Sequence, residues 1–258
     1  MKIYNQRVWL ITLISFMFGF FLVSEMNDSI VLDPDEIDEF TLDPAEFDPN
    51  DEDAKIFRYS KFGRKDEAVY KQSTREEDGA PVIEASSDGS ISTVTTPLRA
   101  DPEIFRFIKW EWKIESVLPS GDMTKKDGDD FAARVYVTFD YDPSNLGFGE
   151  RLKYRLYKTF TSFEIPLRSL NYVWGNEPDE IGDTGPNPFS DWVQYVVIQS
   201  GNDKAGQWLT EKRNIPEDYR MVYGEEPPPI SGITIMTDSD NTGESTKAYF
   251  GPITISKN

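Results

Sequence analysis

The segment Phe131–Phe139 constrains the fold most, because its residue types alternate with the two-residue period of a β-strand. Apolar residues occupy every odd-numbered position, which predicts a face that packs into a core. The opposite face would carry Arg134 and Tyr136, and Asp129 and Asp130 stand just before the strand. We interpret this polar face as the wall of a ligand-binding surface on a β-sandwich.

Similar patterns recur along the chain. Ile104–Val117 alternates apolar with charged residues and contains Trp110 and Trp112, which predicts an antiparallel strand with both tryptophans in the core. Asn214–Gly224 has the cap residues of a short helix, whereas Arg151–Phe160 fits either an amphipathic helix or a strand. Further strand-like runs, separated by turn residues, are Val69–Gln72, Pro81–Ala85, Ile91–Thr95, Leu170–Trp174, Val193–Gln199, Ile230–Thr237 and Tyr249–Ile255.

The spacing of these runs predicts the fold class. Strand-like runs at intervals of about eight to twelve residues, with few helices, are typical of β-sandwiches. We predict an all-β fold, a two-sheet antiparallel β-sandwich of jelly-roll type with one or two short helices, as a single domain over residues 54–258. Asn176–Asp191 is rich in Gly, Pro and acidic residues, and we expect it to be a long lid or binding loop.

Residues 1–24 have the features of an export signal. Lys2 and Arg7 precede an apolar run over residues 8–23, as in a signal peptide. Leu22 and Ser24 would form a poor cleavage site, so the segment is either a cleaved signal peptide or an anchor in the inner membrane. In both cases we predict an exported, periplasmic protein, free or attached to the membrane through residues 8–23.

Residues 25–53 are strongly acidic. They contain thirteen Asp or Glu residues and no Lys or Arg, and Leu32–Asp38 is echoed by Leu42–Asp48. High charge with few apolar residues predicts a disordered tether that holds the domain away from the membrane. A calcium-collecting or docking role for this segment stays open.

The composition excludes several function classes. The chain has 258 residues, a net charge of −19, no cysteine and no histidine. Thiol catalysis, cysteine-ligated metals and histidine-based triads are therefore impossible. No basic patch is visible in the sequence, so we expect no nucleic-acid partner.

The turn Asp238–Gly243 is rich in oxygen donors. Asp238, Asp240, Asn241 and Thr242 are of the types that ligate calcium, and calcium is the cofactor that this turn suggests. An EF-hand does not fit, because Tyr249 stands where the loop needs its final glutamate. The alternative is a plain Asx-turn between two strands.

A ligand-binding site is expected around the polar face of the first segment. Its candidate residues are Asp129, Asp130, Arg134, Tyr136 and Trp174, which combine carboxylates with groups that stack on flat ligands. Alternatively, Arg134 pairs with Asp130 or Asp238 and has no ligand. No catalytic residue can be assigned, because no nucleophile motif is present.

Several motifs occur in an order that is similar to a known family. They are Trp110-Glu111-Trp112, Gly128–Val137, Tyr172–Gly175, Trp208, Arg213-Asn214-Ile215, Asp218-Tyr219-Arg220, Gly224, Ile235–Gly243 and Ala248–Gly251. Together they resemble the bacterial exported family catalogued as domain of unknown function 3047, over roughly residues 55–256. The resemblance implies an exported β-rich domain, and it brings no established activity and no assigned catalytic residues.

These observations predict a binding module for a glycan or another cell-envelope polymer, supported by calcium if the Asp238–Gly243 turn holds an ion. Two other functions stay open. One is a carboxylate-dependent polysaccharide hydrolase or lyase. The other is a structural or assembly protein of the envelope, for which a large exposed apolar patch would be expected.

Overall fold

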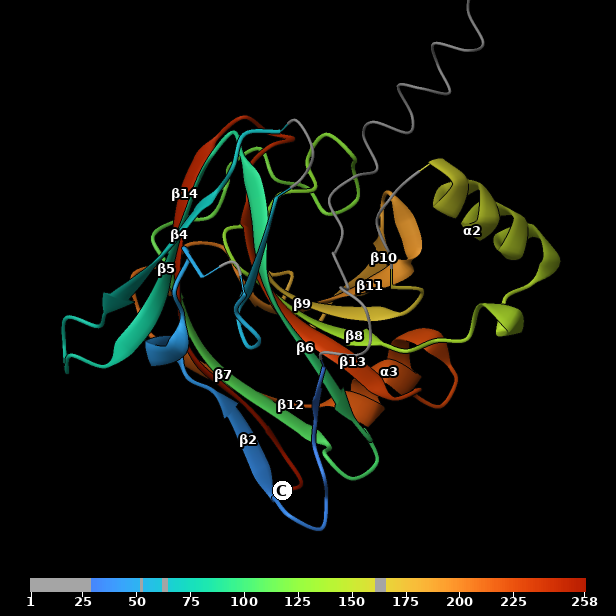
Figure 1. Ribbon diagram of the computed structural model, residues 1–258. Helices are drawn as coiled ribbons and strands as arrows, with labels where there is room; N and C mark the ends of the chain where they lie inside the picture. The colour runs from blue at the N-terminus through green and yellow to red at the C-terminus, as the bar shows by residue number, and fades with distance from the viewer. Residues whose placement is uncertain (1–28, 52, 62–64, 161–165) are drawn as a thin grey trace, which may run out of the picture.

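The computed structural model describes residues 29–51, 53–61, 65–160 and 166–258 of this protein. The described chain is mostly β, and its strands form two sheets that pack as a sandwich, with two short α-helices (Figure 1). The predicted all-β two-sheet sandwich is therefore confirmed. The predicted signal or anchor, residues 1–24, lies outside the described residues. No helix among the described residues combines the length and apolarity that a membrane crossing requires.

The larger sheet has eight strands within the described part of the chain. The β1–β6 and β9–β11 pairs are parallel and the other pairs are antiparallel, while jelly-roll connectivity stays a prediction. The order is β1 (Ile30–Val31), β6 (Ile91–Ala100), β13 (Ile230–Asp238), β8 (Arg134–Phe139), β9 (Ser169–Gly175), β11 (Ser190–Ser200) and β10 (Thr184–Asn187), and β3 (Arg58–Lys61) also pairs with β6.

The smaller sheet has six strands in the same described part. All of its pairs are antiparallel, and β14 pairs with three other strands. The order is β12 (Leu209–Asn214), β7 (Phe107–Ile114), β14 (Ser245–Ser256), β5 (Pro81–Asp88) and β4 (Val69–Thr74), and β2 (Glu39–Leu42) also pairs with β14.

Aromatic side chains from both sheets meet in the core. Trp110 of β7 stacks on Tyr172 of β9 with ring centroids 5.2 Å apart, and Trp112 packs on Trp174 at 5.7 Å. All four side chains are fully buried. The prediction that alternation along β7 directs both tryptophans inward is confirmed, and these contacts hold the two sheets together.

The alternation along β8 holds only from Arg134 onward. Val135 and Val137 belong to the main core, so Arg134 and Tyr136 lie on the opposite, outer face of the larger sheet. Phe131 packs with outer-face residues of β9 and β11. It lies before the first residue of β8, so the alternation of a β-strand does not set the direction of its side chain. Its predicted place on the core face is wrong. The outer face is also buried along β8.

The acidic segment differs from the predicted tether. Within residues 29–51, β1 pairs with β6, β2 pairs with β14, and Pro44–Glu46 forms a short 3-10 helix, η2. Leu42 and Phe47 of the second repeat unit are buried in the core, and the Asp43 carboxylate caps η2 by accepting from the Ala45 N–H at 2.9 Å. The few apolar residues therefore anchor the segment, while its acidic residues face solvent or cap turns.

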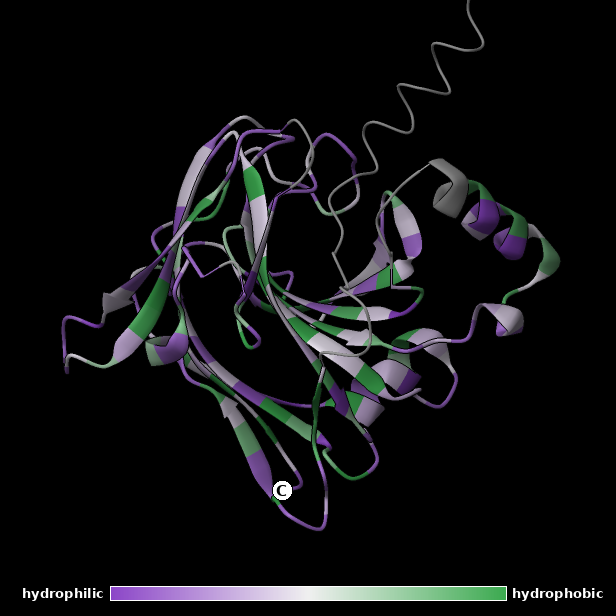
Figure 2. Ribbon diagram, viewed as in Figure 1, coloured by the Kyte–Doolittle hydropathy of each residue, from purple (hydrophilic) through white to green (hydrophobic). Residues whose placement is uncertain are grey.

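The two helices lie at the periphery of the sandwich (Figure 1). α3 (Ile215–Tyr223) confirms the predicted short helix, with Asn214 at its N-terminus and Gly224 in the left-handed conformation at its end. α2 (Phe148–Phe160) resolves the helix-or-strand alternative, and hydrophobic and hydrophilic residues alternate along it (Figure 2). A 3-10 helix, η3 (Pro143–Asn145), precedes it.

The predicted long loop Asn176–Asp191 contains regular structure. β10 lies within it and pairs with β11 as an antiparallel hairpin. The expectation that the whole range is a loop is therefore wrong, because the short run Thr184–Asn187 has a partner strand that the local sequence does not reveal. Its role as a lid or binding segment stays a prediction.

Candidate functional site

Polar side chains form a row across the outer face of the larger sheet. Residues in direct register on neighbouring strands direct their side chains to the same face. Thr95 of β6 is in register with Thr234 of β13, and Thr234 with Tyr136 of β8. The row continues through Asn171 of β9 to Tyr195 of β11. Five neighbouring strands thus present hydroxyl or amide groups on one face, which we call the polar face.

A second row runs beside the first. Thr93 of β6, Met236 of β13 and Arg134 of β8 are in register with one another. Thr138 of β8 is likewise in register with Ser169 of β9. The polar face therefore combines hydroxyls, one amide, one guanidinium and few apolar side chains.

Several polar groups of this face are buried without a hydrogen-bond partner. Thr93, Ser169 and Asn171 each expose less than 1% of their surface. No partner contacts the Thr93 Oγ1, the Ser169 Oγ, or either the Nδ2 or the Oδ1 of Asn171. Other members are satisfied within the face, since the Thr95 and Thr234 hydroxyls lie 2.8 Å apart. Buried polar atoms in proteins are normally paired, so these three residues are exceptional.

The polar face continues into a groove at β3. Arg58 and Ser60 of this strand are in register with Thr95 and Thr93. Both residues also line a groove of about 1050 Å³ between β3, β4 and the segment before β3, together with Asn50, Asp51, Lys55, Tyr59, Glu67 and Tyr70. The polar face is thus contiguous with a groove of mixed charge.

Arg134 links the polar face to a cluster of buried carboxylates. Its Nε donates to the Asp238 Oδ1 at 2.8 Å, and its Nη2 also contacts the Asp238 Oδ2. Its Nη1 donates to the Asp129 Oδ1 at 3.1 Å and to the Tyr136 hydroxyl at 3.3 Å. Arg134 is 1% exposed, so the guanidinium is held by protein groups on three sides.

Asp129 is enclosed by donors from β10 and β11. The Asn187 Nδ2 donates to its Oδ2 at 2.7 Å, and the Tyr195 hydroxyl donates to its Oδ1. Burial raises the pKa of Asp129 from its ordinary value, although Arg134 and these donors oppose the shift. Asp129 therefore orients Arg134, Asn187 and Tyr195 rather than facing solvent.

Asp130 is held by the turn that follows β13. The backbone N–H groups of Asn241 and Thr242 donate to its Oδ2 at 2.9 and 2.6 Å, and the Asn241 Nδ2 donates to its Oδ1 at 2.9 Å. The Asp130 carboxylate therefore joins two loops that are more than 100 residues apart in sequence.

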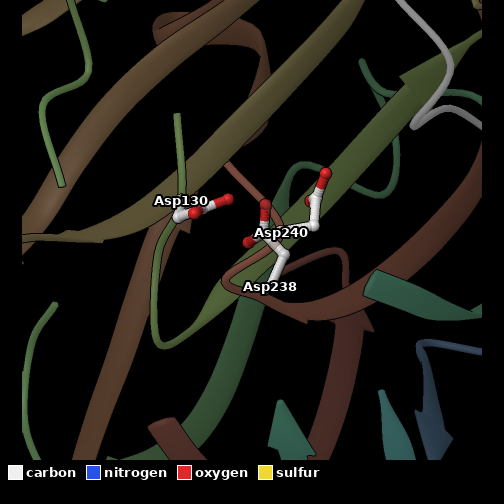
Figure 3. Close-up of side chains that lie close together, drawn as sticks. All are labelled: Asp130, Asp238 and Asp240. Carbon is white, nitrogen blue, oxygen red and sulfur yellow. The ribbon is translucent and has the colours of Figure 1, made fainter. Parts of the chain in front are cut away.

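Three carboxylates converge at this junction (Figure 3). One oxygen each of Asp130, Asp238 and Asp240 lies within 4.8 Å of the others. Burial raises the pKa of Asp238 to about 8, against the lowering effect of Arg134, and the negative charge of Asp130 adds to the rise. The Lys65 ammonium contacts the Asp240 Oδ2, and burial lowers the pKa of Lys65. The cluster concentrates negative charge in a water-poor environment.

The structure brings together most of the residues that the sequence singled out. Asp129, Asp130, Arg134 and Tyr136 meet the turn that carries the predicted calcium ligands Asp238, Asp240, Asn241 and Thr242. Trp174 does not join them: its ring packs in the core and its Nε1 donates to the Gly201 carbonyl at 3.0 Å. Its side chain lies on the inner face of β9, opposite Asn171.

Other members of the site were not found from the sequence. Thr93, Asn171, Thr234 and Tyr195 fall within predicted strands and Asn187 within the predicted loop, whereas Lys65 and Ser169 fall within no predicted element. A signal exists in β6, where Thr93 and Thr95 are two residues apart and so share one face of the predicted strand Ile91–Thr95. The register between strands, which joins these residues into rows, is absent from any single segment.

Comparison with known proteins identifies the family to which this chain belongs. The family model described as "Protein of unknown function (DUF3047)" matches residues 57–254. No curated protein matches the chain in sequence. Among solved structures, the Cellulose induced protein, Cip1, is similar over 85% of this chain and 97% of its own, with 11% identity and a TM-score of 0.40.

Another similar structure is the glycoside hydrolase domain of Endo-D from Streptococcus pneumoniae R6. It has 10% identity and a TM-score of 0.35, and the match covers 78% of this chain but only 22% of that one. At these TM-scores neither structure informs the choice of ligand. The family match alone covers most of the chain, including most strands of both sheets and the carboxylate cluster. The protein is therefore a member of the DUF3047 family.

Proposed function

We propose that this protein is an exported binding module, and that it holds a glycan or a similar hydroxyl-rich polymer of the cell envelope on its polar face. Asn171 carries the proposal. Its amide is fully buried at the centre of the face, and neither its donor nor its acceptor has a partner. An unsatisfied buried polar group costs about 1–3 kcal/mol, so a fold that keeps one loses stability unless a ligand completes its hydrogen bonds.

The neighbours of Asn171 suit a carbohydrate. The hydroxyls of Thr93 and Ser169 are also unpaired, and each can both donate and accept. Tyr136 and Tyr195 flank Asn171 in register on the two adjacent strands. A sugar ring offers hydroxyls around its edge and an apolar face, which fits amide and hydroxyl groups set between aromatic rings.

The layout favours a polymer over a small molecule. The polar groups extend over five strands, which span about 19 Å at roughly 4.8 Å for each spacing. The row then continues through Arg58 into the groove at β3. The members of the row are at most 3% exposed, so a linear chain on this path would contact the groove directly and would reach the polar face only by displacing the segments that cover it.

A carboxylate-dependent hydrolase is less well supported. Glycoside hydrolases commonly place two carboxyl groups about 5–9.5 Å apart across the scissile bond. Here the oxygens of Asp130, Asp238 and Asp240 lie within 4.8 Å of each other, and both Asp130 and Asp238 are bonded to protein donors. This geometry favours a structural or ion-binding role for the cluster.

The test is binding to an array of envelope glycans and plant and bacterial polysaccharides. We expect the protein to bind at least one glycan class, and Asn171→Ala to weaken that binding about tenfold or more. The matched control is Thr41→Ala, which removes a strand hydroxyl on the smaller sheet, bonded to Thr254 at 2.9 Å. Equal losses in both variants, or no glycan bound by the wild type, would overturn the proposal. Capture of an envelope protein through the same face would instead support the assembly alternative.

A further inference from the structure

We propose that Asp130, Asp238 and Asp240 form a calcium site. Asp238 ends β13, Asp240 lies in the turn that follows it, and Asp130 lies in the loop before β8. One oxygen of each lies within 4.8 Å of the others (Figure 3). Oxygens bound to one calcium ion at 2.3–2.6 Å are separated by at most about 5 Å, so the spacing is compatible with a shared ion.

Unpaired oxygens at the cluster distinguish it from an ordinary acidic surface. The Asp240 side chain is 3% exposed, and its Oδ1 is buried with no hydrogen-bond partner. The Oδ1 of the neighbouring Asn241 is also buried and unpaired. Two oxygens of the kinds that bind calcium therefore lack a hydrogen-bond donor. The neighbouring side chains of Asp130 and Asp238 are each at most 1% exposed.

The charge of the cluster supports a divalent ion. Asp129, Asp130, Asp238 and Asp240 bring four carboxylates, while Arg134 and Lys65 bring two positive charges. With all groups ionised, the cluster carries a charge of −2 in a buried environment, which is costly without compensation. One calcium ion would neutralise it.

The donor types select the metal. The chain has no histidine or cysteine, so zinc would lack its usual ligands. Carboxylate and amide oxygens in an irregular arrangement suit calcium, whereas magnesium demands near-ideal octahedral geometry. The ligand set differs from that suggested by the turn alone: Asp130 joins from the other loop, and the Thr242 hydroxyl donates to the Ser239 carbonyl at 3.4 Å.

The position of Lys65 provides a specific test of the calcium site. Its ammonium contacts the Asp240 Oδ2, while the Oδ1 of the same carboxylate is the unpaired atom. Lysine and calcium would therefore share one negatively charged cluster. Removing the lysine charge should strengthen calcium binding, which is the opposite of what a merely destabilised fold would show.

The experiment is calorimetric titration of the full chain with calcium chloride, and with magnesium chloride in parallel, together with melting curves in calcium and in chelator. We expect one calcium per chain and a higher melting temperature in calcium. Asp240→Asn should weaken calcium binding about tenfold or more, and Lys65→Met should tighten it severalfold. Asp203→Asn removes one exposed carboxylate elsewhere and should change nothing.

Three outcomes would overturn the inference: no calcium bound, equal affinity in the Asp240→Asn and Asp203→Asn variants, or weaker binding in Lys65→Met. Preference for magnesium would overturn the choice of calcium. Because the titration contains no glycan, its outcome is separate from that of the array experiment.

Discussion

Arg134 and Asp238 form an ion pair that is buried at the edge of the polar face, with the Arg134 Nε 2.8 Å from the Asp238 Oδ1. Each side chain is 1% exposed. The pair joins Arg134 of the polar face to Asp238 of the carboxylate cluster. It therefore fixes the position of both.

Arg134→Met should destabilise the fold strongly. The substitution leaves Asp129 and Asp238 buried without their shared cation, and loss of one partner of a buried pair costs about 3–5 kcal/mol. Urea unfolding measures the change. The exposed pair of Arg99 with Asp140 provides the control, since Arg99→Met should have little effect. Similar losses of unfolding free energy in the two variants would show that the buried pair stabilises the fold no more than the exposed pair does.

Asn171→Ala should leave stability unchanged or raise it by about 1 kcal/mol. The wild-type amide is buried without partners, so its removal deletes no hydrogen bond. It also removes the free-energy cost of burying the unpaired Nδ2 and Oδ1. Urea unfolding of the ligand-free protein tests this. A loss of several kcal/mol would mean that Asn171 stabilises the sheet and is not kept for a ligand.

Stability in the presence of chelator should fall as pH rises from about 4 to about 8. The pKa of Asp238 is near 8 in the fold against 3.8 as its ordinary value, so the folded state favours the protonated acid. Its contribution is fully present below the unfolded pKa and is lost as pH rises through the folded pKa. The raised pKa of Asp129 acts in the same direction. Unfolding free energies between pH 5 and 9 give the test, and a flat profile would contradict it.

Leu42→Ala should destabilise the protein by about 2–5 kcal/mol, as expected for a large-to-small change in a core. The side chain is 2% exposed. Leu42 is the last residue of β2, which pairs with β14. Val31→Ala, in the same acidic segment but at a position 66% exposed, is the control and should change stability little. If both variants unfold like the wild type, the segment contributes nothing to the fold and behaves as a tether.

Local patterns predicted the elements that depend on neighbouring residues only. The alternation around Trp110 and Trp112 indicated an inward-facing strand, and Asn214 and Gly224 marked the two ends of α3. The richness of the Asp238–Gly243 turn in oxygen donors is likewise visible in the local sequence. In each case the physical cause lies within about ten residues.

The rest depends on pairings between distant segments. The contact of Asp130 with Asn241 joins residues 111 positions apart, and no feature of either loop specifies the other. The row through Thr95, Thr234 and Asn171 exists only once strand order and register are set. Composition also misled the interpretation of the acidic segment, because two or three buried side chains were enough to anchor it.

The position of β14 has a consequence for how the chain folds. This last strand pairs with β7, β5 and β2, so residues 253–256 contact residues 39–42 at the other end of the described chain. The smaller sheet therefore cannot form completely without β14. Pairings across such sequence separations form slowly. Without residues 245–256, β7, β5 and β2 therefore have no common partner strand that joins them into one sheet.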